Sequence, residues 1–338
     1  MASDDDAEPI CPPLPCIPCP PRVQQVMSRV LRAASCVEGT EVRVFGSSVN
    51  GFGDGSSDVD VVLSAGKAQL VAGLQLGKCK RKELAAQTLR KLQRLLKQCG
   101  FHIDLFIARA KVPIIKMSLD CDGDYIECDL SVNNLLPVFN TKLLRCYADL
   151  DPRVVDVVQE CKRWAKEQQV HGADRGNLSS YAFTLLVIFY MQIRGALPCL
   201  QSDGKPSWYS EGARRFNVAM VEAAPIPSPG ATVSFADFVF FYSEEFQWGD
   251  CVVSVRTGRC DPPEKYPDLK IKARTGVEKE ELDYFLHIED PFDIQRNLSC
   301  VLGPGSNYSL WEALRSFKTK AARNQRRWVG RMGPRSAA

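Results

Sequence analysis

The chain has 338 residues, of which 45% are hydrophobic, and a formal net charge of +3 at pH 7. This composition is typical of a globular protein with room for two domains, and it excludes a chain kept disordered by low hydrophobicity. The longest apolar run, 181–191, is too short to cross a bilayer, so we expect no membrane partner. Fourteen cysteines without regular spacing favour a reducing compartment.

The first part of the chain alternates between helical and strand patterns. An N-terminal arm and helix occupy 1–37. The elements predicted from hydrophobic periodicity are a helix at 24–35, strands at 42–45 and 59–63, a basic helix at 80–98, and strands at 102–107, 112–118 and 124–131. This alternation predicts an α/β domain over 38–135, in which a small mixed sheet packs against helices.

Beyond residue 135 the pattern becomes mainly helical. Long apolar periodicities predict helices at 151–170, 179–193 and 235–246. We therefore predict a helical second domain over 136–310, with variable insertions at about 200–230 and 250–283, and a basic C-terminal helix or tail over 311–338.

The most informative motif lies between the first two strands. Gly46 and Ser47 are followed, after ten intervening residues, by Asp58 and Asp60, which open an apolar strand. Because side chains alternate along a strand, the two carboxylates share a face, where they repel each other unless a cation lies between them. Oxygen-only ligands suit Mg²⁺, and a loop rich in Gly and Ser can direct backbone N–H groups at a phosphate. The alternative is a glycine-rich hairpin that ends in a solvated Asp-x-Asp pair.

A third carboxylate follows in the strand predicted at 124–131. Asp129 and Glu127 share one face of that strand by the period of two, so either could complete a two-metal site. From the residues alone both remain candidates.

These motifs together resemble the DNA polymerase β-type nucleotidyltransferases. In that family the third carboxylate directly precedes a Leu/Ile-Ser/Thr pair, which here selects Asp129, before Leu130 and Ser131. The resemblance implies that Asp58, Asp60 and Asp129 are catalytic and bind two Mg²⁺ ions, with Mn²⁺ as an alternative metal. It also implies that Gly46, Ser47 and Ser57 hold the phosphates of a nucleotide.

Motifs in the second half resemble the terminal uridylyltransferases and noncanonical poly(A) polymerases. Lys162 and Lys166 share a helix face, and their alternative is an ordinary solvated face. The resemblance implies that these lysines contact the triphosphate and that the nucleotide lies in a cleft between the two domains. The remaining nucleotide-binding residues implied by the resemblance are Asn140 and Thr141 at the ribose, Ser180 and Tyr181 as a Ser-Tyr pair whose aromatic ring stacks on the base, and Asp290, Asp293 and Arg296 at the base edge.

We therefore predict an RNA uridylyltransferase that adds UMP from UTP to an RNA 3′-hydroxyl. The alternatives are an ATP-using noncanonical poly(A) polymerase and a catalytically weak RNA- or nucleotide-binding subunit of an RNA-processing complex. Basic segments at 78–97 and 315–335 are candidate RNA contacts, although each could be a solvated helix or tail. The short chain resembles minimal trypanosomatid enzymes of the type associated with the mitochondrial editosome-like complex. That resemblance implies an RNA-editing partner complex and a mitochondrial location, with the cytoplasm as the alternative.

Overall fold

The computed structural model describes residues 12–35, 39–55, 57–64, 76–121, 123–201, 205–270 and 286–329, with only the backbone at 318–329. Contacts divide the chain into two compact units. Unit 1 comprises Met1–Leu150 and Asp203–Glu222, and unit 2 comprises Asp151–Ser202 and Ala223–Ala338. Unit 1 therefore extends past the domain boundary expected at 135 and takes in part of the segment expected to be an insertion.

Unit 1 contains a five-stranded mixed sheet in the order β1-β2-β5-β4-β3. Its strands are β1 (Glu41–Phe45), β2 (Val59–Ser64), β3 (Phe101–Ile107), β4 (Ile114–Cys121) and β5 (Asp124–Val132). The central pair β2 and β5 is parallel, and the other neighbours are antiparallel. These strands confirm those expected from the sequence within a few residues.

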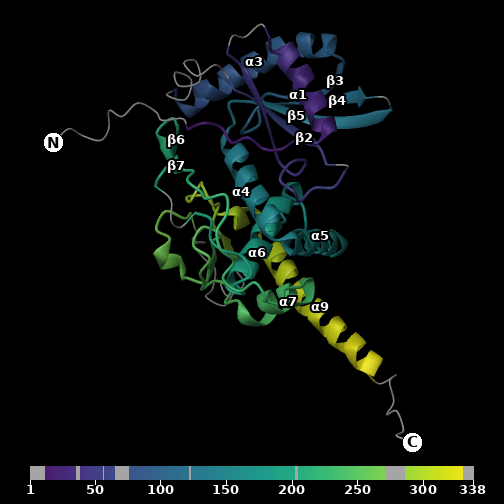
Figure 1. Ribbon diagram of the computed structural model, residues 1–338, viewed down its shortest axis with the longest axis vertical. Helices are drawn as coiled ribbons and strands as arrows, with labels where there is room; N and C mark the ends of the chain where they lie inside the picture. The colour runs from purple at the N-terminus through teal and green to yellow at the C-terminus, as the bar shows by residue number, and fades with distance from the viewer. Residues whose placement is uncertain are drawn as a thin grey trace, which may run out of the picture. The chain divides into compact units, whose positions relative to one another are not determined.

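Three helices pack with this sheet, as Figure 1 shows for α1 and α3. They are α1 (Pro21–Ala33), α3 (Lys78–Gln98) and α4 (Leu136–Leu150). Apolar residues spaced three and four apart give α1 and α3 one buried stripe each, for example Val23, Val26 and Val30 on α1. On β4 and β5 the buried residues alternate with Lys116 and Asp129, which remain partly exposed. The sheet thus presents these polar residues on the face away from its apolar packing.

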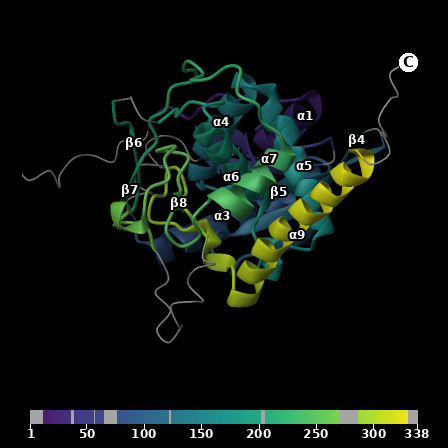
Figure 2. The ribbon, with the colours of Figure 1, turned by 90° about the horizontal axis from the view of Figure 1, so that it is seen from below.

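Unit 2 is mainly helical. Its helices are α5 (Pro152–Glu167), α6 (Ser180–Ile193), α7 (Phe235–Phe240) and α9 (Pro304–Val329), with short helical turns η2 (Ala173–Arg175), η3 (Phe241–Glu245), η4 (Pro263–Lys265) and η5 (Leu298–Val301). Helix α6 is buried from Ala182 to Gln192, so the apolar run is a core helix as expected. Figure 2 shows α9 beside α7, in agreement with their contacts. No helix in the described part of the chain is long and apolar enough to cross a membrane.

The segment expected to be a variable insertion at about 200–230 contains a hairpin. Its strands are β6 (Trp208–Glu211) and β7 (Arg214–Asn217). The ring of Tyr209 lies 5.8 Å from that of Phe139, and the Arg81 guanidinium lies 3.7 Å from the Glu211 carboxylate. Strands of four residues give too short an alternation to detect, and their stability depends on contacts with distant parts of unit 1.

Unit 2 also contains a two-stranded parallel sheet of β8 (Val252–Val253) and β9 (His287–Ile288). Strand β8 lies in the segment expected to be a variable insertion at about 250–283.

Candidate active site

The carboxylates predicted to bind metal are brought to one level of the unit 1 sheet. Parallel pairing of β2 with β5 sets Asp60 directly opposite Asp129, and Asp58 lies just before β2. Burial, followed by the charges of Asp129 and Asp58, raises the pKa of the Asp60 carboxyl to about 7. The register therefore places Asp129 level with Asp60, and Glu127 lies two residues away on the same strand.

The glycine-rich loop closes over these carboxylates. Gly46 has φ +82°, and a Cβ added to it would meet the Asp60 carboxylate. The Gly46 N–H donates to Thr141 Oγ1 at 2.9 Å, and that hydroxyl donates to the Pro137 carbonyl at 2.7 Å. Thr141 is buried, so its observed role is to hold the loop against α4. Glycine at 46 is thus required by both the backbone conformation and the close approach of Asp60.

The other loop residues support the same turn. Ser57 Oγ accepts from the Asp54 N–H at 3.1 Å, and the Ser57 carbonyl accepts from Arg22 Nη2 at 2.8 Å. Ser47 lies in the turn between β1 and β2 and is half-buried. These hydrogen bonds fix the C-terminal end of the loop against α1. A fixed backbone of this kind is what an anion-binding site requires.

The three aspartates provide oxygen ligands that suit a hard divalent cation, but their side chains do not converge on one point. Carboxylate oxygens are the ligands that Mg²⁺ prefers. Among the described residues, no three His, Cys, Asp or Glu side chains gather closely enough to hold a metal ion. The Asp129 carboxylate instead accepts from Lys116 Nζ at 3.1 Å and 3.3 Å, and this contact raises the pKa of Lys116.

In unit 1 the side-chain oxygen of Asn140 is a hydrogen-bond acceptor without a partner among the described residues. Asn140 lies in α4, one residue before Thr141, and its Oδ1 is buried. A buried acceptor without a partner is costly, so a hydroxyl donor supplied by a ligand would satisfy it. The predicted ribose contact agrees with this observation.

In unit 2 the predicted phosphate ligands surround His171. Lys162 is half-buried and Lys166 is exposed on α5, and His171 Nε2 lies 2.8 Å from Ser180 Oγ at the start of α6. Burial, and then the cations Lys166, Arg175 and Lys162, lower the pKa of His171. The contact of His171 with Ser180 was not predicted from the sequence, because it depends on the fold of the loop between α5 and α6.

The predicted base-recognition residues form a second cluster in unit 2. Asp290 is fully buried, and its Oδ1 accepts from the N–H groups of Phe292 and Asp293 at 3.2 Å and 3.1 Å. Its Oδ2 lies 3.5 Å from the Tyr181 hydroxyl and 3.7 Å from Arg296 Nη1. Burial raises the pKa of both Asp290 and Tyr181, so the tyrosine stays a hydroxyl donor at neutral pH. Asp290 thus shapes the turn that carries Asp293 and Arg296.

An ion pair between Arg256 and the buried carboxylate of Glu289 supports the backbone of this cluster. Glu289, the neighbour of Asp290, accepts from Ser254 Oγ at 2.6 Å and from Arg256 Nη2 at 2.7 Å. Its N–H donates to the Val253 carbonyl at 3.0 Å. The strand β8 and the residues after it therefore fix the backbone from which Asp290 projects.

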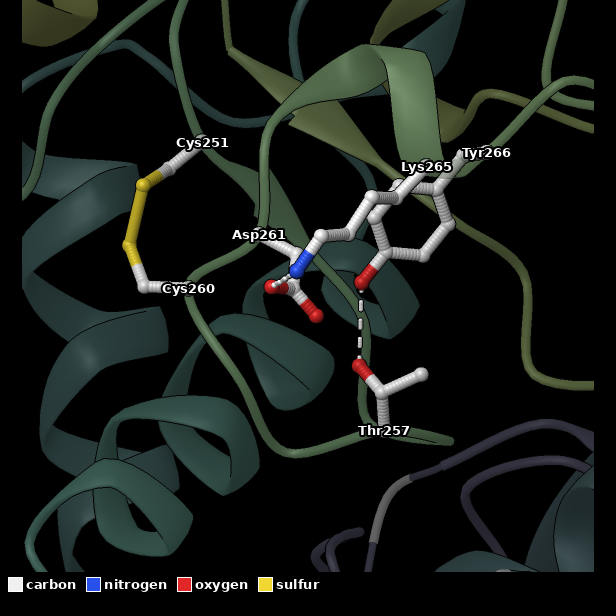
Figure 3. The surroundings of a disulfide bond; sticks show 6 residues. All are labelled: Cys251, Thr257, Cys260, Asp261, Lys265 and Tyr266. Atoms are coloured by element: carbon white, nitrogen blue, oxygen red, sulfur yellow. Dashed lines mark hydrogen bonds and ion pairs between the residues drawn. A yellow bond between two sulfur atoms is a disulfide. The ribbon is translucent and has the colours of Figure 1, made fainter.

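A disulfide closes the loop that carries Ser254 and Arg256. Cys251 and Cys260 are joined with their Cα atoms 5.4 Å apart, although the scattered cysteines suggested only free thiols. Figure 3 shows the disulfide beside the ion pair of Asp261 with Lys265 and the hydrogen bond of Thr257 with Tyr266. These contacts stabilise the segment that holds Glu289.

The structure thus places the predicted residues in two sets. Asp58, Asp60, Asp129, Gly46, Ser47, Ser57, Asn140 and Thr141 lie in unit 1, whereas Lys162, Lys166, Ser180, Tyr181, Asp290, Asp293 and Arg296 lie in unit 2. That both sets face one cleft stays a prediction. Lys116, His171 and the Glu289–Arg256 pair were missed, because each of these contacts depends on tertiary structure.

Two family models match the chain in these regions. Residues 21–149 match the central palm domain of the mitochondrial-like poly(A) RNA polymerase, and residues 232–296 match the Cid1 family poly A polymerase. The first match contains all three aspartates, and the second ends at Arg296.

Curated relatives include both uridylyl- and adenylyl-transferring proteins by name. Terminal uridylyltransferase 7 of Homo sapiens is 31% identical over 306 residues, which are 86% of this chain and 18% of the relative. Poly(A) RNA polymerase GLD2 of Danio rerio is 32% identical over 259 residues, 73% of this chain and 47% of the relative. By these matches the chain is similar to the terminal uridylyltransferases and poly(A) polymerases, which are nucleotidyltransferases. It spans less than half the length of each of these two relatives.

The fold of the chain is that of solved poly(U) polymerase structures. A structure of the Cid1 poly(U) polymerase bound to MgATP matches with a TM-score of 0.66 and 23% identity, covering 89% of this chain and 90% of that one. Cid1 in complex with the UTP analogue UMPNPP matches with a TM-score of 0.65 and 22% identity, covering 90% and 89%. These matches confirm the predicted architecture of a polymerase β-like sheet domain followed by a mainly helical part.

Replacing Gly46 by alanine tests the loop geometry. We expect Gly46→Ala to lower nucleotidyl transfer by about a hundredfold or more while the protein stays folded, because the new methyl group displaces Asp60 and strains the backbone. Gly55→Ala is the matched control, because a Cβ at residue 55 meets nothing within 4 Å. Activity and circular dichroism of both variants check this, and equal activities would contradict the assigned role.

The raised pKa of Asp60 predicts a stability change without metal. Its folded-state pKa of about 7 lies above the unfolded value of about 3.9, so the folded chain holds more protons in this interval and loses stability as pH rises through it. In EDTA at about pH 8 we expect Asp60→Asn to be more stable than the natural chain by on the order of 2–4 kcal/mol. The gain should shrink on acidification towards about pH 4.

Urea unfolding at both pH values measures this difference. Glu127→Gln is the control, because Glu127 is an exposed carboxylate on the same face of β5. A gain for Asp60→Asn that is independent of pH would show that Asp60 is not held in a charge-repelling site.

Proposed function

We propose that this chain transfers UMP from UTP to the 3′-hydroxyl of RNA and releases pyrophosphate. The observation that carries the proposal is the placement of Asp60 level with Asp129 on adjacent parallel strands, directly under the Gly46 loop. The matches to nucleotidyltransferase family models and the similarity to named uridylyltransferases support it.

Residues of unit 1 supply the chemistry in this proposal. Asp58, Asp60 and Asp129 would hold divalent cations, which neutralise the charge that develops on the phosphates and on the attacking oxygen. The Gly46 loop and Ser47 orient the triphosphate, while Asn140 Oδ1 accepts from a ribose hydroxyl and so satisfies its orphaned acceptor. Positioning and electrostatics therefore account for most of the rate.

Residues of unit 2 supply base selection. The Arg296 side chain is 52% exposed and carries only donors, which complement the carbonyl oxygens of uracil and oppose the exocyclic amino group of adenine. Asp293, on the turn held by Asp290, would accept from the N3–H of uracil. Tyr181 offers a ring for stacking, which gives about 1–3 kcal/mol per base without selecting its identity.

RNA binding requires basic surface. Arg90, Arg94 and Lys97 of α3 line a surface hollow, in agreement with the predicted RNA contact of the basic helix. The predicted contact at 315–335 falls mostly outside the described side chains. The trypanosomatid relationship, the editing complex and the mitochondrial location stay predictions that follow from resemblance alone.

Primer extension tests this function. A short RNA with a free 3′-hydroxyl, Mg²⁺ and each nucleoside triphosphate in turn should give extension with UTP. Asp129→Asn should slow it by at least about a thousandfold, because removing a metal ligand costs several kcal/mol of transition-state stabilisation. Glu127→Gln should retain activity, and Arg296→Met should narrow the preference for UTP over ATP.

Two other results would redirect the assignment. Preferential extension with ATP would place the chain with the poly(A) polymerases, to which GLD2 and the family models also point. UTP binding without any extension would instead support a nucleotide-binding subunit of a larger complex.

A further inference from the structure

Lys116 places a positive charge inside the proposed metal site. Antiparallel pairing of β4 with β5 sets Lys116 opposite Asp129 on the same sheet face. Its Nζ contacts both carboxylate oxygens of Asp129, at 3.1 Å and 3.3 Å, and it acts electrostatically on Asp58 and Asp60 as well. The ammonium therefore neutralises part of the charge that the aspartates accumulate.

The ammonium and a metal ion compete for the same oxygens. An ammonium held against both oxygens of a carboxylate repels a metal ion that the same carboxylate would hold jointly with Asp60, so opening the ion pair favours coordination of the metal. The Lys116 side chain is 45% exposed and the Asp129 side chain 24%, so the pair has room to separate. Opening the pair costs the lysine little free energy, because its long, flexible side chain lets the ammonium be solvated by water.

We propose that Lys116 is a resident counter-cation that Asp129 exchanges for a divalent metal ion. This inference rests on the proposed function and specifies how its metal site is loaded. The two aspartates Asp58 and Asp60 accept a cation without breaking the Lys116 ion pair, whereas the position that uses Asp129 fills only when the pair opens. Metal loading is consequently ordered, with a tighter position and a weaker one.

The alternative role for Lys116 is a surface ion pair that only links β4 to β5. Such a pair would contribute little, because the strands are already joined by a ladder from Ile114 to Cys121. The two roles differ in what happens to metal affinity when the charge is removed. A purely structural pair leaves that affinity unchanged.

Mn²⁺ binding to the whole chain without nucleotide distinguishes the roles, with free Mn²⁺ measured by electron paramagnetic resonance. For the natural chain we expect one tighter and one weaker site. Lys116→Met should tighten the weaker site by about three- to tenfold, since the competing ion pair is lost. Lys116→Arg should leave the site as weak or weaken it further, because a guanidinium fits a carboxylate in a bidentate manner.

Lys142→Met is the matched control. Lys142 forms a lysine–carboxylate ion pair with Glu222 at 3.0 Å and is not among the charges that shift the pKa of Asp60, so both Mn²⁺ affinities should stay as in the natural chain. The unfolding temperature in EDTA, measured for every variant, shows whether each remains folded.

The outcomes separate this inference from the function on which it rests. Two Mn²⁺ sites in the natural chain with identical affinities in Lys116→Met would overturn the exchange and leave the transferase proposal standing. No Mn²⁺ binding by the folded natural chain would overturn both. A weaker site that tightens in Lys116→Met and not in Lys142→Met supports the exchange.

Discussion

The mutual repulsion of carboxylates on two adjacent parallel strands is the constraint on which this active site depends. Pairing of β2 with β5 sets Asp60 level with Asp129, and burial keeps water from screening their charges. Two neighbouring features lie against these carboxylates. The Gly46 loop approaches so closely that no side chain fits, and Lys116 supplies a cation from β4. A site that is unfavourable for its own carboxylates is favourable for divalent metal ions and for the phosphates they carry.

In the second unit, buried hydrogen bonds and ion pairs hold the turn that is predicted to recognise the base. Asp290 is fully buried and accepts two backbone N–H groups, so it acts as part of the framework. Glu289 next to it is fixed by Ser254 and Arg256 from a loop that a disulfide closes. The exposed guanidinium of Arg296 is thereby presented on a rigid turn, and rigidity is what converts a hydrogen-bonding pattern into selectivity.

The alternating strands and the apolar helix α6 are each contained within a short stretch of chain, and both were predicted from the sequence. The spacing of Gly46, Asp58 and Asp60 is equally local, and the role of these residues at a metal site stays a prediction. The family resemblance was needed to choose Asp129 over Glu127, because period-two alternation treats them equally. What remained unpredicted depends on distant partners. Arg256 reaches Glu289 across 33 residues, and the β6–β7 hairpin packs on α4 through Phe139 and Tyr209. Such pairings follow from tertiary packing and produce no periodic pattern in the sequence.

In the proposed function the aspartates act on the α-phosphate of UTP through a bound metal ion. The most direct measurement is primer extension with the two diastereomers of UTP that carry sulfur on the α-phosphate, in Mg²⁺ and then in Mn²⁺. Because Mg²⁺ prefers oxygen ligands and binds sulfur poorly, one diastereomer should be slow in Mg²⁺ and recover in Mn²⁺, which accepts softer ligands. If both diastereomers react in Mg²⁺ as fast as UTP itself, no metal contacts that phosphate and the account is contradicted.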